Sequence, residues 1–154
     1  MYNTETRAIE PLTEQEVGLY VCGVTPYDTS HLGHAFTYTI FDVLIRYLRF
    51  LGRKVNYVQN VTDIDDDVLM RATKLNDDWQ ALGNREYAAF RKQMAALGNL
   101  DPDVAPRATE HIPEMLEIVE GLIAKGLAYE NQGSVYFEVA KDADFGRLFG
   151  DGYE

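Results

Sequence analysis

The chain has 154 residues, 46% of them hydrophobic, which suits about one globular domain with its own core. Its 25 Asp and Glu against 14 Lys and Arg give a formal net charge of −11, so the chain lacks the basic surface with which nucleic-acid-binding proteins neutralise phosphates. A single cysteine cannot form an internal disulfide, and no apolar run approaches the roughly 20 residues of a membrane span, so we expect a cytoplasmic protein without a membrane partner.

Two short apolar runs with a helical pattern between them predict a strand–helix–strand unit. The runs Gly18–Cys22 and Lys54–Val61 are rich in Val and Tyr, as strands are. Between them, apolar residues recur at helical spacing over residues 32–51. The unit has the length of a βαβ crossover, so we expect two parallel strands with the helix on one face.

Capping residues mark the ends of the expected helices, and a hairpin follows the last one. Ser, Thr and Asp accept hydrogen bonds from the free N–H groups at a helix start, and Gly often ends a helix. Residues 127–139 predict a hairpin with its turn at 131–133. The capping signals are Thr29 or Ser30 before the first helix and Gly52 after it, Asp78 before a helix from Trp79 towards Leu97, and Thr109 before a last helix that Gly126 ends.

The acidic run TDIDDD has part of the pattern of a calcium-binding loop. Asp63, Asp65 and Asp67 have the first three spacings of an EF-hand loop. However, Val68 stands where the glycine is required and Lys74 where the bidentate glutamate is required. We therefore interpret the run as a helix N-terminus, where carboxylates suit the helix dipole.

Polar side chains gather where the first strand ends, where the helix begins and where the second strand ends. Cys22 ends the first strand, His31 and His34 share one face of the first helical turn, and Asn60 and Thr62 end the second strand. Ligands of open parallel sheets bind beyond the carboxyl ends of the strands, where helix N-termini offer N–H groups to phosphates. The pattern predicts a nucleotide site here, but neither a Walker loop nor G-x-G-x-x-G is present.

Each of these residues also has a simpler interpretation. A lone cysteine is most often a small buried hydrophobic residue. A histidine at a helix start is more often solvated than functional. Gly33 leaves room between the two histidines for a flat ring or a phosphate. The combination of these residues, rather than any one of them, favours a site.

Five segments carry a resemblance to a known family. They are YVCGVTPYD, HLGHA, RYLRFLG, YVQNVTDIDDD and PRATEHIPEMLEIVEGLIAKGLAY. Together they resemble the N-terminal half of the catalytic domain of class I cysteinyl-tRNA synthetases, and HLGH is similar to the HIGH signature of that class. The ligase that joins cysteine to an amino sugar in mycothiol synthesis shares these motifs, and DDWQALGNRE leans towards it, whereas RYLRFLG and LIAKGLAY lean towards the synthetase.

The resemblance implies an α/β fold, namely a Rossmann-like (HUP-type) parallel sheet with flanking helices, truncated, with a helical insertion and a β-hairpin. It implies one partial catalytic, nucleotide-binding domain over residues 1–154, with the insertion at about 76–139. The implied activity is that of a cysteine–tRNA ligase: cysteine and ATP give cysteinyl-adenylate, and the cysteine is then transferred to tRNA. The alternatives are the amino-sugar ligase and a non-catalytic nucleotide-binding half-domain.

The resemblance also implies roles for individual residues. Cys22 corresponds to a zinc ligand, and a soft thiolate of the substrate binds Zn²⁺ far better than the hydroxyl of serine does. ATP is the implied substrate, accompanied by Mg²⁺. The implied catalytic residues are His31 and His34; the implied ATP-binding residues are His31, Gly33, His34 and Thr37; the implied cysteine or cysteinyl-adenylate site comprises Gly23, Val24, Thr25, Asn60, Val61 and Thr62.

Several parts of the family's active site have no counterpart in this sequence. The further zinc ligands, a later Cys, His and Glu, and the KMSKS loop lie outside the chain, so we expect weak or absent zinc binding by Cys22 alone. L-cysteine and ATP are the expected small-molecule partners. We expect tRNA to bind through regions outside this chain, and the uncovered apolar surface to favour self-association.

Overall fold

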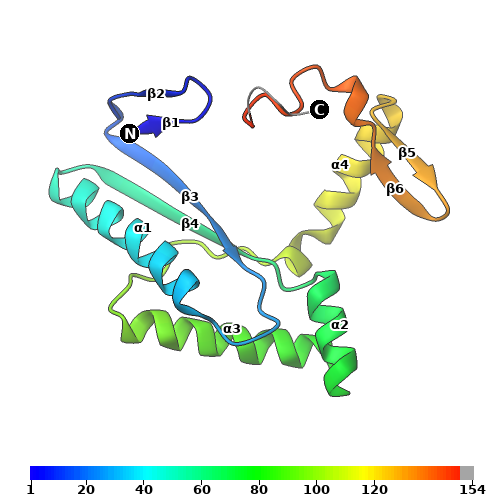
Figure 1. Cartoon of the computed structure of the whole chain (residues 1–154), viewed down its shortest axis with the longest axis horizontal. Helices are drawn as coiled ribbons and strands as arrows, with labels where there is room; N and C mark the ends of the chain where they lie inside the picture. Colours follow the sequence, from blue (N-terminus) through cyan, green and yellow to red (C-terminus); the bar gives the residue numbers. More distant parts are fainter. Residues whose placement is uncertain (150–154) are drawn as a thin grey trace. The chain divides into compact units, whose positions relative to one another are not determined.

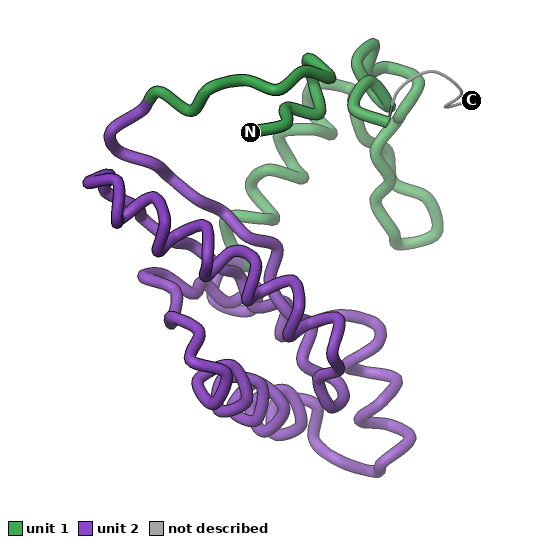
Figure 2. The backbone as a smooth tube through the Cα atoms, turned by 60° about the vertical axis from the view of Figure 1, so that its left-hand side comes forward, with its two compact units in different colours: residues 1–13, 112–154 green, residues 14–111 purple. Residues whose placement is uncertain are grey.

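The structure is a computed structural model that describes residues 1–149, and it divides into two compact units (Figure 2). One unit is Glu14–His111, and the other joins Met1–Thr13 to the chain from Ile112 onwards. The expected single domain includes residues 150–154, which lie outside the described residues. The expected insertion at 76–139 spans the boundary between the units and stays a prediction.

The unit Glu14–His111 is built on the predicted strand–helix–strand arrangement. Strands β3 (Glu16–Val24) and β4 (Lys54–Val61) are parallel, and α1 (Leu32–Phe50) connects them and lies along the pair (Figure 1). β4 has the predicted bounds, whereas β3 is two residues longer at each end than predicted. The predicted α/β class with a parallel sheet is confirmed.

Alternation along the strands places the core of this unit. Val55, Tyr57, Gln59 and Val61 of β4 are buried, while the residues between them are more exposed. This period of two is what a strand with one covered face requires. The buried face extends to Val61 at the carboxyl end of β4, so the core packs directly beneath the predicted site.

Two further helices follow β4. They are α2 (Asp66–Leu75) and α3 (Trp79–Ala96), which pack on each other. Asp78 caps α3 as predicted, because its side chain accepts a hydrogen bond from the N–H of Ala81 at 2.8 Å. The acidic run begins α2 as predicted, with Asp65 as its N-cap.

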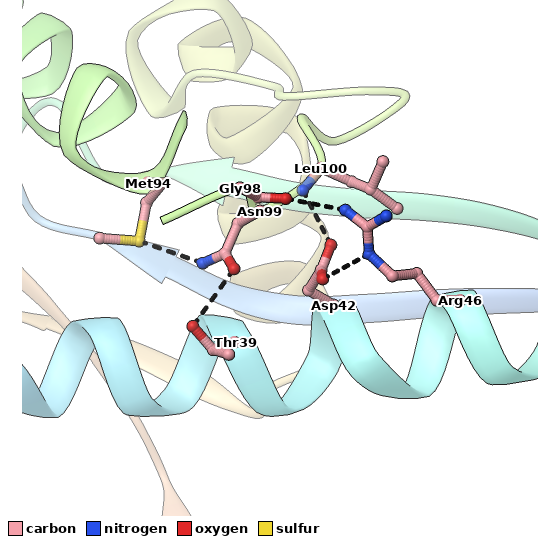
Figure 3. A network of polar contacts seen from close by, with 7 residues as sticks. All are labelled: Thr39, Asp42, Arg46, Met94, Gly98, Asn99 and Leu100. Atoms are coloured by element: carbon pink, nitrogen blue, oxygen red, sulfur yellow. Dashed lines mark hydrogen bonds and ion pairs between the residues drawn. The ribbon is translucent and has the colours of Figure 1, made fainter. Parts of the chain in front are cut away.

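A polar network fastens the loop after α3 to α1 (Figure 3). The buried carboxylate of Asp42 accepts hydrogen bonds from the N–H of Leu100 at 2.8 Å and from Nε of Arg46 at 2.7 Å. Arg46 also donates to the carbonyl of Gly98 at 2.7 Å. The bonds to the loop link residues 52 and 58 positions apart and so fix α3 relative to the sheet.

The segment after this loop runs beside the free edge of β4. The N–H groups of Gln59 and Val61 donate to the carbonyls of Val104 and Pro106 at 3.0 and 2.8 Å. The segment continues into a short 3₁₀ helix, Ala108–His111. The prediction that Thr109 caps the last helix is wrong, because Thr109 lies inside this 3₁₀ turn and its N–H and hydroxyl both donate to Asp63.

The other unit contains only short elements besides one helix. β1 (Tyr2–Asn3) and β2 (Ala8–Ile9) are antiparallel. α4 (Ile112–Ala124) ends before Gly126, which has a φ of +68°, and a 3₁₀ turn, Val139–Lys141, follows the hairpin. The predicted hairpin is confirmed as β5 (Ala128–Asn131) paired with β6 (Ser134–Phe137). Across residues 1–149, no helix is both long and apolar enough to cross a membrane.

Candidate functional site

A β-bulge interrupts the pairing of β3 with β4 at the predicted site. The two strands are in register up to Val21, and pairing resumes at Val24, so Cys22 and Gly23 together lie opposite Asn60. A bulge of this kind places one extra residue in a strand and redirects the side chains next to it. Because of the bulge, Val24 lies on the buried face, as Val21 does, and Cys22 follows Val21 on the exposed face. The simpler interpretation of Cys22 as a buried hydrophobic residue is therefore wrong.

Gly23 is the residue that permits the bulge. A Cβ atom at this position would lie 1.5 Å from the carbonyl oxygen of Asn60, far inside van der Waals contact. Gly18, on the same strand, has nothing within 4 Å of its hypothetical Cβ. The close approach of the two backbones thus requires glycine at position 23 and not at position 18.

The side chain of Asn60 fills the space that the bulge opens. Its Oδ1 accepts hydrogen bonds from the N–H of Gly23 at 2.6 Å and from the hydroxyl of Tyr20 at 2.8 Å. Its Nδ2 donates to Oγ1 of Thr62 at 3.2 Å. Four residues at the ends of the two strands are therefore joined through one amide group.

A tyrosine of α1 also reaches the bulge. The hydroxyl of Tyr38 donates to the carbonyl of Cys22 at 3.2 Å. Burial raises the pKa of Tyr38 to about 12, so the hydroxyl keeps its proton and remains a donor at neutral pH. Sequence reasoning missed this contact, because nothing in the helical pattern distinguishes Tyr38 from the other apolar positions.

The two predicted histidines form the cap of α1. His31 is the N-cap, with extended backbone, and its Nδ1 accepts a hydrogen bond from the N–H of Gly33 at 3.1 Å. The Nδ1 of His34 accepts from the N–H of His31 at 3.2 Å, and the two rings stack with their centroids 4.0 Å apart. The predicted caps Thr29 and Ser30 are therefore wrong, because an imidazole acceptor occupies the position that a hydroxyl was expected to fill.

These hydrogen bonds define the proton positions of the two rings. A nitrogen that accepts a hydrogen bond carries no proton, so in the neutral form of either ring the proton lies on Nε2. Burial, and secondarily the charge of His31, lowers the pKa of His34, which favours the neutral form at pH 7. Each ring thus presents an Nε2–H donor. A Cβ at Gly33 would lie 2.8 Å from Cε1 of His31, so the space beside Gly33 is taken by the His31 ring.

The remaining predicted residues fall into two groups. Val24 and Val61 are 6% and 1% exposed, so they can contribute only backbone groups to a site. The carbonyl of Val24 accepts from the N–H of Thr62 at 3.0 Å. Thr25 is half-buried in the loop after β3, and Thr37 is exposed on α1, one turn after His34. Among residues 1–149, no side-chain hydrogen bond joins either threonine to Cys22, Gly23 or Asn60.

Asp63 is a buried polar residue, and the prediction that it belongs to a helix N-terminus is wrong. Its carboxylate is 6% exposed and accepts from the N–H of Thr109 at 3.0 Å, the hydroxyl of Thr109 at 2.7 Å and Nη1 of Arg107 at 3.3 Å. Arg107 in turn lies over the ring of Tyr87, 5.3 Å from its centroid. Asp63 therefore holds the 3₁₀ turn against the end of β4 rather than serving the dipole of α2.

The donors needed for a zinc site are not assembled by the described residues. Across residues 1–149, no three His, Cys, Asp or Glu side chains lie close enough together to hold a metal ion. Cys22 is exposed and would supply a single sulfur ligand, whereas zinc sites use three or four protein ligands. The residues present therefore do not fit a complete zinc site.

Comparisons with solved structures support the fold. The structure of methionyl-tRNA synthetase from Mycobacterium tuberculosis, in complex with methionyl-adenylate, is similar with a TM-score of 0.64. The likeness covers 73% of this chain and 23% of that chain at 24% sequence identity. It supports the Rossmann-like fold of a class I synthetase.

Comparisons of sequence place the chain in a family. The cysteine–tRNA ligase of Cronobacter sakazakii is 51% identical over 152 residues, which are 96% of this chain and 33% of that protein. The chloroplastic and mitochondrial cysteine–tRNA ligase of Arabidopsis thaliana is 44% identical over 97% of this chain and 27% of its own length. The chain thus spans about a third of the length of such relatives. The pattern described as the class I (C) tRNA synthetase catalytic domain matches residues 8–154, so the chain belongs to this family.

Proposed function

We propose that this chain belongs to a cysteine–tRNA ligase and contributes its nucleotide and cysteinyl-adenylate site. The observation that carries the proposal is the start of α1, where two stacked imidazoles present Nε2–H donors one turn before Tyr38, which contacts the bulge at Cys22. The identity to cysteine–tRNA ligases over nearly the whole chain supports it.

The proposed reaction is an in-line displacement at phosphorus. A carboxylate oxygen of cysteine attacks the α-phosphorus of ATP, the bond from that phosphorus to the bridging oxygen breaks, and pyrophosphate leaves with the electron pair. Negative charge develops on the phosphate oxygens, and His31 and His34 are proposed to donate to them from Nε2. Such catalysis depends on positioning and on preorganised donors.

The ligand is proposed to lie along the ends of β3 and β4. ATP would bind at His31, Gly33, His34 and Thr37, with Mg²⁺ accompanying its phosphates. Cysteinyl-adenylate would lie against Gly23, Val24, Thr25, Asn60, Val61 and Thr62. Val24 and Val61 would act through their backbones, because their side chains are buried.

We propose that complete zinc binding needs ligands besides Cys22 and that tRNA binds outside the described residues. Cys22 is proposed as one zinc ligand, but the incomplete donor set predicts weak zinc binding by this chain alone. tRNA is proposed to bind through regions outside this chain, which agrees with the net charge of −11. The cytoplasm remains the proposed compartment, supported by the single cysteine.

Self-association through α1 is proposed as well. One face of this helix carries exposed apolar side chains at helical spacing, among them Leu32 at 88% and Phe50 at 84% exposure. Surfaces of this kind often mark interfaces, and a second copy would cover the face by antiparallel packing of the two helices. Size-exclusion chromatography with light scattering should then give a dimer, and Phe36→Lys should return it to a monomer. A monomer at high concentration would contradict this proposal.

Isothermal titration calorimetry tests the proposed ligand. The chain is titrated with a non-hydrolysable cysteinyl-adenylate analogue and with the seryl analogue, each with and without added zinc. We expect both analogues to bind through the nucleotide, and added zinc to favour the cysteinyl form. Binding of neither analogue would contradict the proposal for this chain and would favour a non-catalytic half-domain.

A further inference from the structure

One peptide unit at the bulge is held at both ends by side chains. The carbonyl of Cys22 accepts from the hydroxyl of Tyr38 at 3.2 Å, and the N–H of Gly23 donates to Oδ1 of Asn60 at 2.6 Å. The carbonyl and the N–H belong to the same planar peptide. In a regular pair only one of these two groups could bond to the backbone of β4, because they point to opposite sides of the strand, and the bulge disrupts that pairing.

Both side chains that hold this peptide are themselves fixed. Tyr38 is 6% exposed and packs edge-on against Phe90, with ring centroids 5.2 Å apart. Asn60 is tied to Tyr20 and Thr62 through its remaining hydrogen bonds. One holds the peptide from α1 and the other from β4, so the peptide plane cannot rotate without breaking a bond to a fixed group.

This peptide plane sets the backbone at the end of β3. The peptide joins Cys22 to Gly23, so rotation of the plane would change ψ of Cys22 and φ of Gly23, and with them the directions of the N–H and carbonyl groups. Cys22 is exposed, and apolar packing therefore does little to hold the backbone here. The hydrogen bonds with Tyr38 and Asn60 are the contacts that fix this peptide.

We propose that Tyr38 and Asn60 are positioning residues that clamp the Cys22–Gly23 peptide and so fix the backbone against which the proposed cysteinyl-adenylate lies. The role in ligand recognition rests on the proposed function, whereas the clamp itself does not. Asn60, which lines the proposed ligand site, then acts also through the backbone of Cys22 and Gly23, because its amide atoms are bonded within the protein.

Amide hydrogen exchange followed by NMR tests the clamp without any ligand. In Asn60→Ala and in Tyr38→Phe, the exchange of the Gly23 amide should quicken by about three- to tenfold, roughly what one hydrogen bond contributes. The amide of Val61, which donates to Pro106, serves as an internal reference and should not change. Asn60→Asp keeps the Oδ1 acceptor and should leave the Gly23 amide close to wild type.

Matched variants separate the clamp from a general loss of stability. Tyr87→Phe removes the hydroxyl of a half-buried tyrosine whose ring stacks on the same Phe90. Asn56→Ala changes an exposed asparagine on the same strand. Both controls should leave the exchange of Gly23 unchanged. Tyr38→Phe keeps the ring in the core, so it remains informative even if Asn60→Ala fails to fold.

Affinity for the cysteinyl-adenylate analogue then tests the functional part. We expect Asn60→Ala and Tyr38→Phe to weaken it by about tenfold, a loss typical of misplaced recognition groups. Faster exchange at Gly23 with no binding by the wild type would support the clamp and contradict the proposed function. Unchanged exchange at Gly23, or equal acceleration at Val61, would overturn the clamp. Faster exchange with unchanged affinity would overturn its role in recognition.

Discussion

Two helices in the same unit begin in opposite ways. α1 is capped by His31, its capping contacts come from two imidazoles, and its first turn contains no acidic residue. α2 is capped by Asp65, and Asp66 and Asp67 occupy its first turn. Both starts leave backbone N–H groups with a partial positive charge.

The two helices differ in whether charged side chains compensate the positive end of the helix dipole. At α2 the protein supplies its own carboxylates, so a further anion would be repelled. At α1 no carboxylate lies in the first turn, and the partial positive charge remains for an anionic ligand such as a phosphate. The comparison therefore favours α1 over α2 as the nucleotide site, although the acidic run attracts more attention in the sequence.

The largest expected effect is on stability, and it distinguishes the buried Asp63 from the exposed carboxylates at the start of α2. Asp63→Ala should lower the free energy of unfolding by roughly 2–4 kcal/mol, because it leaves the partly buried Arg107 without its carboxylate partner and removes two bonds to Thr109. Asp66→Ala, at an exposed first-turn position, should cost less than about 1 kcal/mol. Urea denaturation measures both. Equal losses would show that Asp63 belongs with the acids of α2.

The next effect concerns the histidine cap itself. His31→Asn should keep the cap, since Asn is a preferred N-cap residue, but it removes the Nε2–H donor. Affinity for ATP should fall by about tenfold or more, the worth of a hydrogen bond to a charged group. The free energy of unfolding should change by less than about 1 kcal/mol. A loss of stability without a loss of ATP affinity would make His31 a structural cap only.

A smaller effect follows from making α1 resemble α2. Leu32→Glu places an acid in the first turn of α1, at an exposed position. Stability should rise by about 0.3–1 kcal/mol, and ATP affinity should fall by roughly the corresponding two- to fivefold. Leu32→Gln is the uncharged control and should do neither. ATP binding that is indifferent to the charge would contradict the electrostatic comparison.

The smallest effect is a dependence on pH. The pKa of His34 is lowered from 6.5 in the folded protein, so stability from this residue is fully present above about pH 6.5. It decreases as the pH falls from 6.5 towards the lowered value, where protonation of Nδ1 would break the bond to the N–H of His31. In His34→Gln, which can complete a capping box without titrating, this decrease in thermal midpoint should shrink. An unchanged decrease would assign it to other groups.

Local patterns were enough to predict the framework of the site. Hydrophobic periodicity predicted β4 with its observed bounds, the parallel βαβ arrangement and the hairpin. The polar residues at the ends of the strands were also expected together, and Cys22, Gly23, Asn60 and Thr62 do meet. These predictions depend only on period and on topology, which a sequence expresses directly.

Contacts between distant residues could not be predicted in the same way. The acidic run places several carboxylates close together along the chain, but only the fold brings Asp63 to Thr109, 46 positions away. The bulge depends on the approach of Gly23 to Asn60, and a glycine in a strand can equally mark a tight bend or a position without a packing partner. His31 was not expected as a cap, because imidazole is an uncommon capping group and two hydroxyl residues precede it.

The measurement that tests the central claim most directly is an NMR titration of the ¹⁵N-labelled chain with ATP. We expect the amides of Gly33 and His34 at the start of α1 to shift progressively and saturate, while those of Asp67 and Val68 at the start of α2 stay in place. Shifts confined to the start of α2, or none at Gly33 and His34 at millimolar ATP, would contradict the assignment of α1 as the nucleotide site.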